Sequence, residues 1–206
     1  MAEPASPFRT AEQRLLDREA KRDAVLLAAV KMFNERGFQA TSLDDVAASL
    51  GITKPTIYHY LGNKDKVLLE CLTLGLNQLI TAVDEANREA GSGLDRLRHF
   101  LERYAEINMS PFGQSVIRTD AAFLSGDSAI QFKELKRRID GSLRELIRDA
   151  MADGSIAPQD PKMLAFTLAG ALNWPARWYD PKGDLTPAEI ARAMVDILSA
   201  GLLPRS

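Results

Sequence analysis

Residues 42–61, SLDDVAASLGITKPTIYHYL, decide the fold, because they encode two short helices joined by a tight turn. Ser42 stands three residues before Asp45, which is the spacing of a side-chain cap at a helix start. Gly51 is placed to end the first helix, as glycine does just past a C-terminus. A second short helix is predicted to follow and to end near Leu61.

The two short helices carry apolar residues on one side only, so they are expected to pack against the rest of a small domain. The residues expected to be buried are Val46, Ala47, Leu50, Ile57 and Leu61. Thr53 is expected to cap the second helix, Pro55 fits its first turn, and Ile52 fills the gap at the turn. This pattern predicts a helix-turn-helix unit, whose second helix lies in the major groove of DNA.

The outward side of the second helix carries side chains that can bind DNA. These residues are Lys54, Thr56, Tyr58, His59 and Tyr60. We assign Lys54, Thr56 and His59 to base edges, and Tyr58 and Tyr60 to phosphate contacts that set the register. The alternative is that residues 58–60 pack between helices. Three consecutive helical residues span about 200° around the axis, however, and cannot all face a core.

Helices are predicted on both sides of this unit. Apolar periodicity predicts a helix over about 15–36, which Gly37 ends. Asn63 is placed to cap a long helix over about 64–89. Lys64, at the start of that helix, is a candidate phosphate contact, and the alternative is a solvated lysine.

The chain is expected to divide into a tail and two domains. Residues 1–13 contain two prolines and read as a flexible tail. Arg9 and Arg14 are candidates to touch DNA from this end, with a solvated tail as the alternative. We expect a DNA-binding domain over 14–68 and a second, larger domain over 69–206.

The rest of the chain is predicted to be helical, because no segment shows sustained period-two alternation. Glycine and proline breaks divide it into helices expected near 94–109, 113–124, 128–152, 161–179 and 187–202. Pro175 is expected to kink one of them. Thr186 is expected to cap the last helix, with Pro187 in its first turn and Glu189 completing the cap. The predicted fold class is all-α, with about nine helices.

Composition narrows the classes of protein to which the chain can belong. The chain has 206 residues, of which 46% are hydrophobic, enough for a substantial core. The single Cys71 excludes an internal disulfide, and two histidines and one cysteine at unrelated spacings give no zinc-site pattern. We therefore expect no metal, and no cofactor. The N-terminus lacks the apolar run of a signal peptide, so we expect a cytoplasmic protein that does not span a membrane. The net charge of −2 decides nothing, because phosphate contacts come from one local face.

From Val25 to Leu69 the chain resembles the DNA-binding domain of the TetR family of one-component regulators. The resemblance centres on AAVKMFNERGFQATSLDDVAASLGITKPTIYHYLGNKDKVLLE, residues 28–70. A glycine ends the first helix, Thr41–Ser42 opens the second, and Tyr58 and Lys64 fall at the family's spacings. The resemblance implies a three-helix DNA-reading domain at the N-terminus.

The resemblance also implies which residues contact DNA. They are Thr41 or Ser42, Lys54, Thr56, Tyr58, His59 and Lys64. Of these, we assign Ser42 and Lys64 to phosphates. Two positions depart from the family pattern: Leu61 stands where phenylalanine is usual, and Pro55 where glycine or alanine is common.

A homodimer is implied by the same resemblance, with the last two long helices pairing with their twins to place two reading helices on successive major grooves. The helices expected at 161–179 and 187–202 are apolar around much of their circumference, more than burial within one domain needs. Small residues that permit close helix approach are Ala165, Ala169, Gly170 and Ala171. Trp174, Trp178 and Tyr179 are expected to stiffen the dimer seam.

Residues 171–203, with the run NWPARWY, resemble a TetR branch associated with acyl-coenzyme A or fatty-acid responses. We therefore expect a cavity for a small hydrophobic effector. Its apolar candidates are Phe100, Tyr104, Phe112, Phe123, Phe132, Phe166 and Leu168, and its polar candidates are Arg118, Asn173 and Arg177. The alternative for each aromatic residue is plain core packing.

A basic cluster precedes the middle of the predicted 128–152 helix, at Lys133, Lys136, Arg137 and Arg138. It is placed to meet a coenzyme A phosphate at a cavity mouth. The interleaved Glu134 and Asp140 instead favour a solvated helix face.

Together these patterns predict a ligand-responsive transcriptional regulator, a repressor that a small hydrophobic effector releases from its operator. An enzyme is the alternative from another class. Against it, the sequence has no glycine-rich phosphate loop, no nucleophile motif and no paired histidines for a metal. A third possibility is a DNA-binding structural protein without ligand, which would bind any sequence with a steep salt dependence.

Overall fold

The structure is a computed structural model that describes residues 11–202, and within that range all regular structure is helical. The chain divides into two compact units, and the boundary falls between Val67 and Leu68. The all-α prediction is confirmed for the described residues. Arg9 lies outside them.

The first unit is a small three-helix domain. It contains α1 (Ala11–Arg36), α2 (Leu43–Ser49), α3 (Lys54–Leu61) and the first turn of α4 (Lys64–Ala86). Helix α1 begins four residues before the predicted start, so residues 11–13 of the predicted tail are helical. Side chains from all three helices meet in the core, among them Leu26, Val46 and Ile57, each 0% exposed.

The turn between α2 and α3 depends on Gly51, whose φ of +64° is a left-handed conformation that favours glycine. The N–H of Ile52 then donates to the carbonyl of Ala47 at 3.0 Å, which closes the turn. Leu50 was predicted to be buried, and this was wrong, because its side chain is 37% exposed. Leu50 is the C-cap residue of α2, so it lies past the helical face that Val46 and Ala47 bury.

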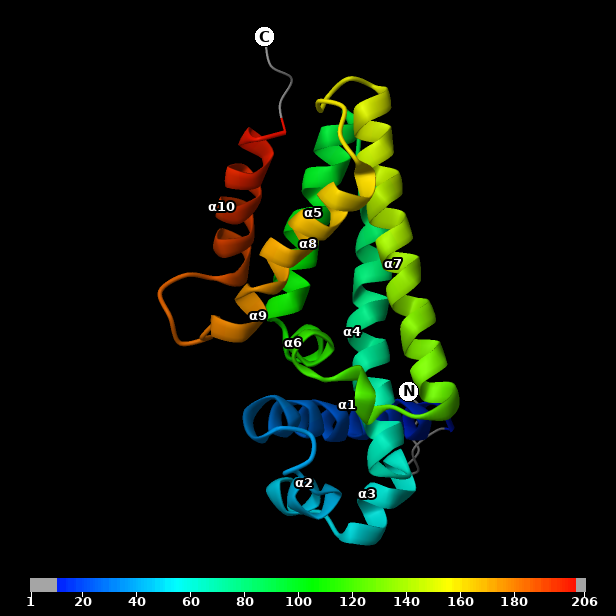
Figure 1. Cartoon of the computed structure of the whole chain (residues 1–206). Coiled ribbons are helices and arrows are strands. Elements are labelled where there is room, and N and C mark those ends of the chain that lie inside the picture. Colours follow the sequence, from blue (N-terminus) through cyan, green and yellow to red (C-terminus); the bar gives the residue numbers. More distant parts are fainter. Residues whose placement is uncertain (1–10, 203–206) are drawn as a thin grey trace, which may run out of the picture. The chain divides into compact units, whose positions relative to one another are not determined.

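The second unit is built around α5 (Gly93–Met109), which lies between α10 (Pro187–Ala200) and α7 (Gly126–Ala152) (Figure 1). Helix α5 also packs against α6 (Pro111–Arg118), α8 (Pro161–Asn173) and α9 (Pro175–Trp178). Its side chains Leu97, Phe100 and Leu101 are at most 1% exposed. This helix is therefore the centre of the core.

Two predicted helices of the second unit are each divided in two. The segment expected over 113–124 is α6, which begins at Pro111, followed by a 3-10 turn, η1 (Ala121–Phe123). The segment expected over 161–179 breaks at Trp174 into α8 and α9, because Pro175 has no N–H to continue the helix. Capping by Thr186 and Glu189 at the start of α10 is confirmed.

Helix α4 is long and apolar enough, by length and composition, to cross a membrane, and half of the segment that meets this criterion is buried inside the protein. That burial is typical of a core helix. Cys71 lies on α4 with no exposed surface and belongs to the core. Burial raises the pKa of its thiol to about 12, so Cys71 stays a thiol at neutral pH.

The corner between α5 and α6 gives a test of the packing. A methyl group at Gly113 would lie 1.8 Å from the carbonyl oxygen of Ile107, whereas one at Gly141 on α7 would meet no atom within 4 Å. We expect Gly113→Ala to lower the free energy of unfolding by about 2 to 3 kcal/mol, because the backbone must move. Gly141→Ala should raise it by about 0.5 to 1 kcal/mol through helix propensity. Urea unfolding measures both, and equal effects would contradict the packing described here.

Candidate functional site

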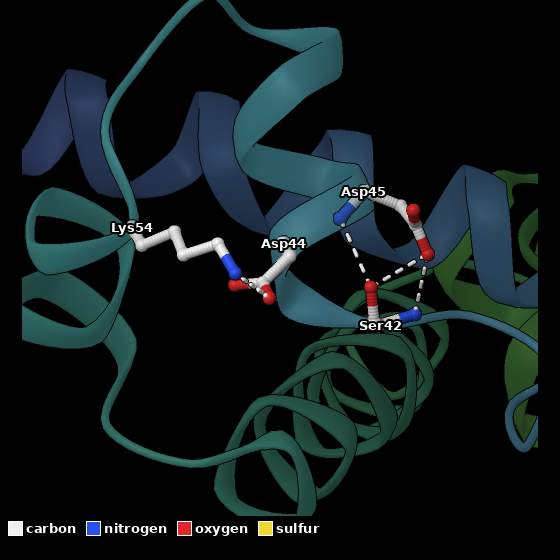
Figure 2. Close-up of polar contacts among 4 residues, drawn as sticks. All are labelled: Ser42, Asp44, Asp45 and Lys54. Atoms are coloured by element: carbon white, nitrogen blue, oxygen red, sulfur yellow. Dashed lines mark hydrogen bonds and ion pairs between the residues drawn. The ribbon is translucent and has the colours of Figure 1, made fainter.

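Helix α2 begins with a reciprocal cap between Ser42 and Asp45 (Figure 2). The Ser42 hydroxyl accepts from the Asp45 N–H at 3.1 Å, and the Asp45 carboxylate accepts from the Ser42 hydroxyl at 2.6 Å and from the Ser42 N–H at 3.0 Å. These bonds hold the pKa of Asp45 below its ordinary value. Ser42 is exposed at this helix start, where backbone N–H groups favour an anion.

Thr41 does not belong to the exposed surface, which corrects its assignment as a DNA contact. Its side chain is 1% exposed. Its hydroxyl reaches the carbonyls of Gly37 at 2.9 Å and Met32 at 3.3 Å. Thr41 therefore fastens the turn that follows α1, and this leaves Ser42 as the candidate at the start of α2.

Helix α3 turns one face into the core and the other to solvent. Ile57 and Leu61 are 0% and 5% exposed, whereas Tyr58 is 50% exposed and His59 is also exposed. Tyr60 is half-buried, and its ring meets that of His59 edge-on, with 5.7 Å between centroids. Packing between helices therefore does not account for Tyr58 or His59.

The start of α3 is polar and tied to α2. The Lys54 ammonium forms an ion pair with Asp44, which raises the pKa of Lys54 (Figure 2). Thr53 is the N-cap residue by its backbone, but its side chain makes no cap bond and instead pairs with the Thr56 hydroxyl at 2.8 Å. Lys54 and half-buried Thr56 remain candidates for base edges at this end of the helix.

Lys64 is held in place rather than freely solvated. Its Nζ lies 4.3 Å from the centre of the Phe38 ring and donates to the Gln39 carbonyl at 3.3 Å. Asn63 caps α4 as predicted, since its side-chain oxygen accepts from the Lys66 N–H at 2.9 Å. Lys64 is therefore positioned at a helix N-terminus, where a phosphate would meet both a cation and N–H groups.

The second unit contains a pocket of about 570 Å³ between α4, α5, α6, α7 and α8. Four of the predicted cavity residues line it: Tyr104, Phe132, Phe166 and Asn173. Its other lining residues are Leu76, Leu79, Val116, Ile117, Ala129, Lys133, Lys136, Arg137, Ile139, Asp140, Leu143 and Ala169. The apolar spacing of Phe132, Ile139 and Leu143 along one helix is a signal that sequence reasoning missed.

The other predicted cavity residues do not line this pocket. Phe100 and Leu168 are at most 1% exposed and belong to the core. The Arg118 Nε donates to the Ala176 carbonyl at 2.7 Å, which joins α6 to α9. Phe112, Phe123 and Arg177 are also absent from the lining. For these six residues, contact with a ligand stays a prediction.

The pocket combines mostly apolar walls with three basic side chains, and the half-buried Asp140 also lines it. Lys133, Lys136 and Arg137 on α7 line it and are exposed, so they lie at its mouth. Tyr104 is 8% exposed and therefore lies deeper, and burial raises the pKa of its hydroxyl. Such a pocket suits a ligand with a hydrocarbon part and an anionic part.

Apolar side chains stand exposed on the last helices of the second unit. On α8, Met163 and Phe166 are more than half exposed, as is Trp174 at its C-cap. Ile197 on α10 is 75% exposed. Clusters of large exposed apolar residues are typical of protein interaction surfaces.

The first unit contains two short helices, of which the second buries one face and presents the other to solvent. The second unit is helical and contains a pocket. Together these features define a helix-turn-helix transcriptional regulator. Residues 25–71 match the family described as bacterial regulatory proteins, tetR family. Residues 90–202 match the tetracyclin repressor-like, C-terminal domain. The chain belongs to the TetR family of DNA-binding transcriptional regulators.

Similar proteins are regulators as well. The HTH-type transcriptional repressor KstR2 of Mycolicibacterium smegmatis is 27% identical over 186 residues, which cover 89% of this chain and 91% of that protein. PfmR, a TetR family transcriptional regulator from Thermus thermophilus, aligns with a TM-score of 0.79 and 31% identity over 87% of this chain and 99% of its own. The structure of AibR with isovaleryl coenzyme A and operator DNA aligns with a TM-score of 0.77 and 24% identity over 90% and 100%, which is a likeness of fold.

Tyr58→Phe tests the role of the exposed tyrosine on α3. The variant keeps the ring and loses only the hydroxyl, so we expect operator and non-operator duplexes to bind less tightly by a similar factor of about three to ten. Selection from a randomised duplex library, followed by anisotropy titrations, measures this. A loss confined to one base pair of the selected site would contradict a phosphate role.

Asp44→Asn tests the ion pair between α2 and α3. In the free protein, Asp44 neutralises Lys54 and places a negative charge beside the reading helix. We expect the variant to bind DNA several-fold more tightly at low salt, because the freed ammonium can reach phosphate.

The matched control is the double variant Asp44→Asn/Lys54→Gln, measured by the same titrations. Compared with Lys54→Gln alone, it should show a much smaller gain, since no ammonium remains to be freed and only the repulsion by the Asp44 carboxylate is removed. An equal gain without Lys54 would show that the ion pair is not its source.

Proposed function

We propose that this chain is a homodimeric repressor that leaves its operator when an amphipathic effector, of the acyl-coenzyme A kind, enters the pocket of the second unit. The observation that carries the proposal is the pocket itself. Its walls are apolar, whereas Lys133, Lys136 and Arg137 stand exposed at its mouth. A hydrocarbon chain and a phosphate-bearing head would each meet a suitable partner there.

One relative supports repression, and one protein of the same fold supports the choice of effector. KstR2, similar over most of both chains, is a transcriptional repressor. AibR, which shares the fold, has been seen with isovaleryl coenzyme A and operator DNA.

The exposed apolar residues of α8 and α10 support a second copy of the chain as partner. An interface between copies would remove from water the side chains of Phe166, Trp174 and Ile197. Gly170 on α8 would let helices approach closely. A twofold axis would present two copies of α3 to successive major grooves. We propose a cytoplasmic protein without enzymatic activity, metal or cofactor.

Coupling between the two sites would run along α4. This single helix begins with Lys64 in the first unit and contributes Leu76 and Leu79 to the pocket. A ligand that favours one arrangement of the pocket walls would bias α4, and with it the spacing of the two reading helices.

The experiment has two stages. A thermal-shift screen compares acyl-coenzyme A thioesters, free fatty acids and aromatic compounds, and the selected operator is then titrated with any compound that raises the melting temperature. We expect an acyl thioester to stabilise the protein and to weaken operator binding by a factor of about 5 to 150. A compound that binds and leaves operator affinity unchanged would contradict the coupling.

Equal affinity for all sequences in the same titrations, together with no response to any compound of the screen, would contradict a ligand-responsive regulator.

A further inference from the structure

Besides the charged side chains of α7, the lining of the pocket in the second unit contains one group of polar side chains. Tyr104 and Asn173 line the pocket, and Asn108 lies behind them with no exposed surface. The Tyr104 hydroxyl donates to the Asn173 side-chain oxygen at 2.8 Å, and the Asn108 amide nitrogen donates to the same oxygen at 3.0 Å. Both lone pairs of that oxygen are therefore used within the protein.

A backbone group fixes the orientation of these amides. The Asn108 nitrogen also lies 3.4 Å from the Leu172 carbonyl, which can only accept a hydrogen bond. Asn108 must therefore direct its nitrogen toward Asn173. Asn173 must direct its side-chain oxygen toward Asn108 as the acceptor, because the reverse orientation would place two N–H groups against each other.

This orientation leaves the Asn173 nitrogen as a donor at the pocket. Among residues 11–202, no acceptor bonds to it. The Asn108 oxygen, fully buried, also lacks a partner in that range. Buried polar groups normally have hydrogen-bond partners. Two amide atoms without partners beside the pocket therefore point to a role in binding a ligand rather than in stability.

We propose that Asn173 donates a hydrogen bond to an uncharged oxygen of the effector, and that Asn108 is a positioning residue that aims it. This inference rests on the proposed acyl-thioester function and specifies its ligand: the hydrocarbon part must carry a carbonyl or hydroxyl oxygen. A ligand without one would leave the Asn173 donor desolvated and unpaired.

Three coenzyme A probes separate the possible sources of this oxygen. Octanoyl-coenzyme A has a thioester carbonyl, S-octyl-coenzyme A has none, and 3-hydroxyoctanoyl-coenzyme A adds a hydroxyl to the chain. We expect at least one oxygen to improve binding about tenfold in calorimetric titrations of the full chain. If the carbonyl is read, octanoyl-coenzyme A exceeds S-octyl-coenzyme A; if the chain oxygen is read, only the hydroxylated probe gains.

Variants test the residues through the ratio of two affinities, that of the oxygen-bearing probe that gains over that of S-octyl-coenzyme A. A general loss of folding does not change this ratio. Asn173→Leu should bring the ratio to about one while S-octyl-coenzyme A still binds, and Asn108→Leu should lower it several-fold. Phe132→Leu, in the apolar wall, is the matched control and should weaken all probes with the ratio unchanged.

Three results would overturn the inference. Equal binding of all three probes to the unaltered protein removes the polar recognition, yet leaves the proposed function standing if they release operator. A ratio that survives Asn173→Leu assigns the recognition elsewhere. Failure of every probe to bind removes both the inference and the acyl-thioester function on which it rests.

Discussion

Helix α3 has eight residues, too few to be stable by itself, and it exists because Ile57 and Leu61 are buried. That burial fixes the rotation of the helix about its axis. Of the three residues between these anchors, Tyr58 and His59 are then held at the surface. Phosphate and base contacts demand such fixed positions, since a mobile helix would lose the binding free energy to ordering.

Charge on this surface is balanced rather than strongly basic. Asp44 and Asp45 stand in the first turn of α2, and one of them pairs with Lys54 of α3. Acidic side chains at a helix start stabilise the helix, but they oppose an approaching phosphate. This local balance favours recognition through positioned hydrogen bonds over indiscriminate attraction.

Local signals in the sequence predict the helix-turn-helix unit well. The caps at Ser42 and Asn63 and the break at Gly51 depend on residues a few positions apart, and the structure has all three. Thr41 was misassigned because its neighbours in space, Met32 and Gly37, come from the end of α1 and the turn after it. The side that a polar residue faces depends on packing, which a linear pattern does not record.

The pocket was predicted less completely, for a related reason. Its walls come from five helices, and a list of aromatic residues cannot tell Phe100, at the centre of α5, from Phe132, at the pocket wall. Leu76 and Leu79 of α4 gave no sequence signal beyond apolar periodicity. The break at Trp174 followed from Pro175, but the hydrogen bonds of neighbouring Asn173 depend on residues far away in the chain.

The account depends most on linkage between the pocket and the DNA-reading surface. Calorimetric titration of octanoyl-coenzyme A into the free protein and into the protein bound to its operator tests that linkage directly. Thermodynamic reciprocity requires the effector to bind the operator complex more weakly, by the same factor by which it weakens operator binding. Equal affinity of the effector for the free and the DNA-bound protein would contradict the account.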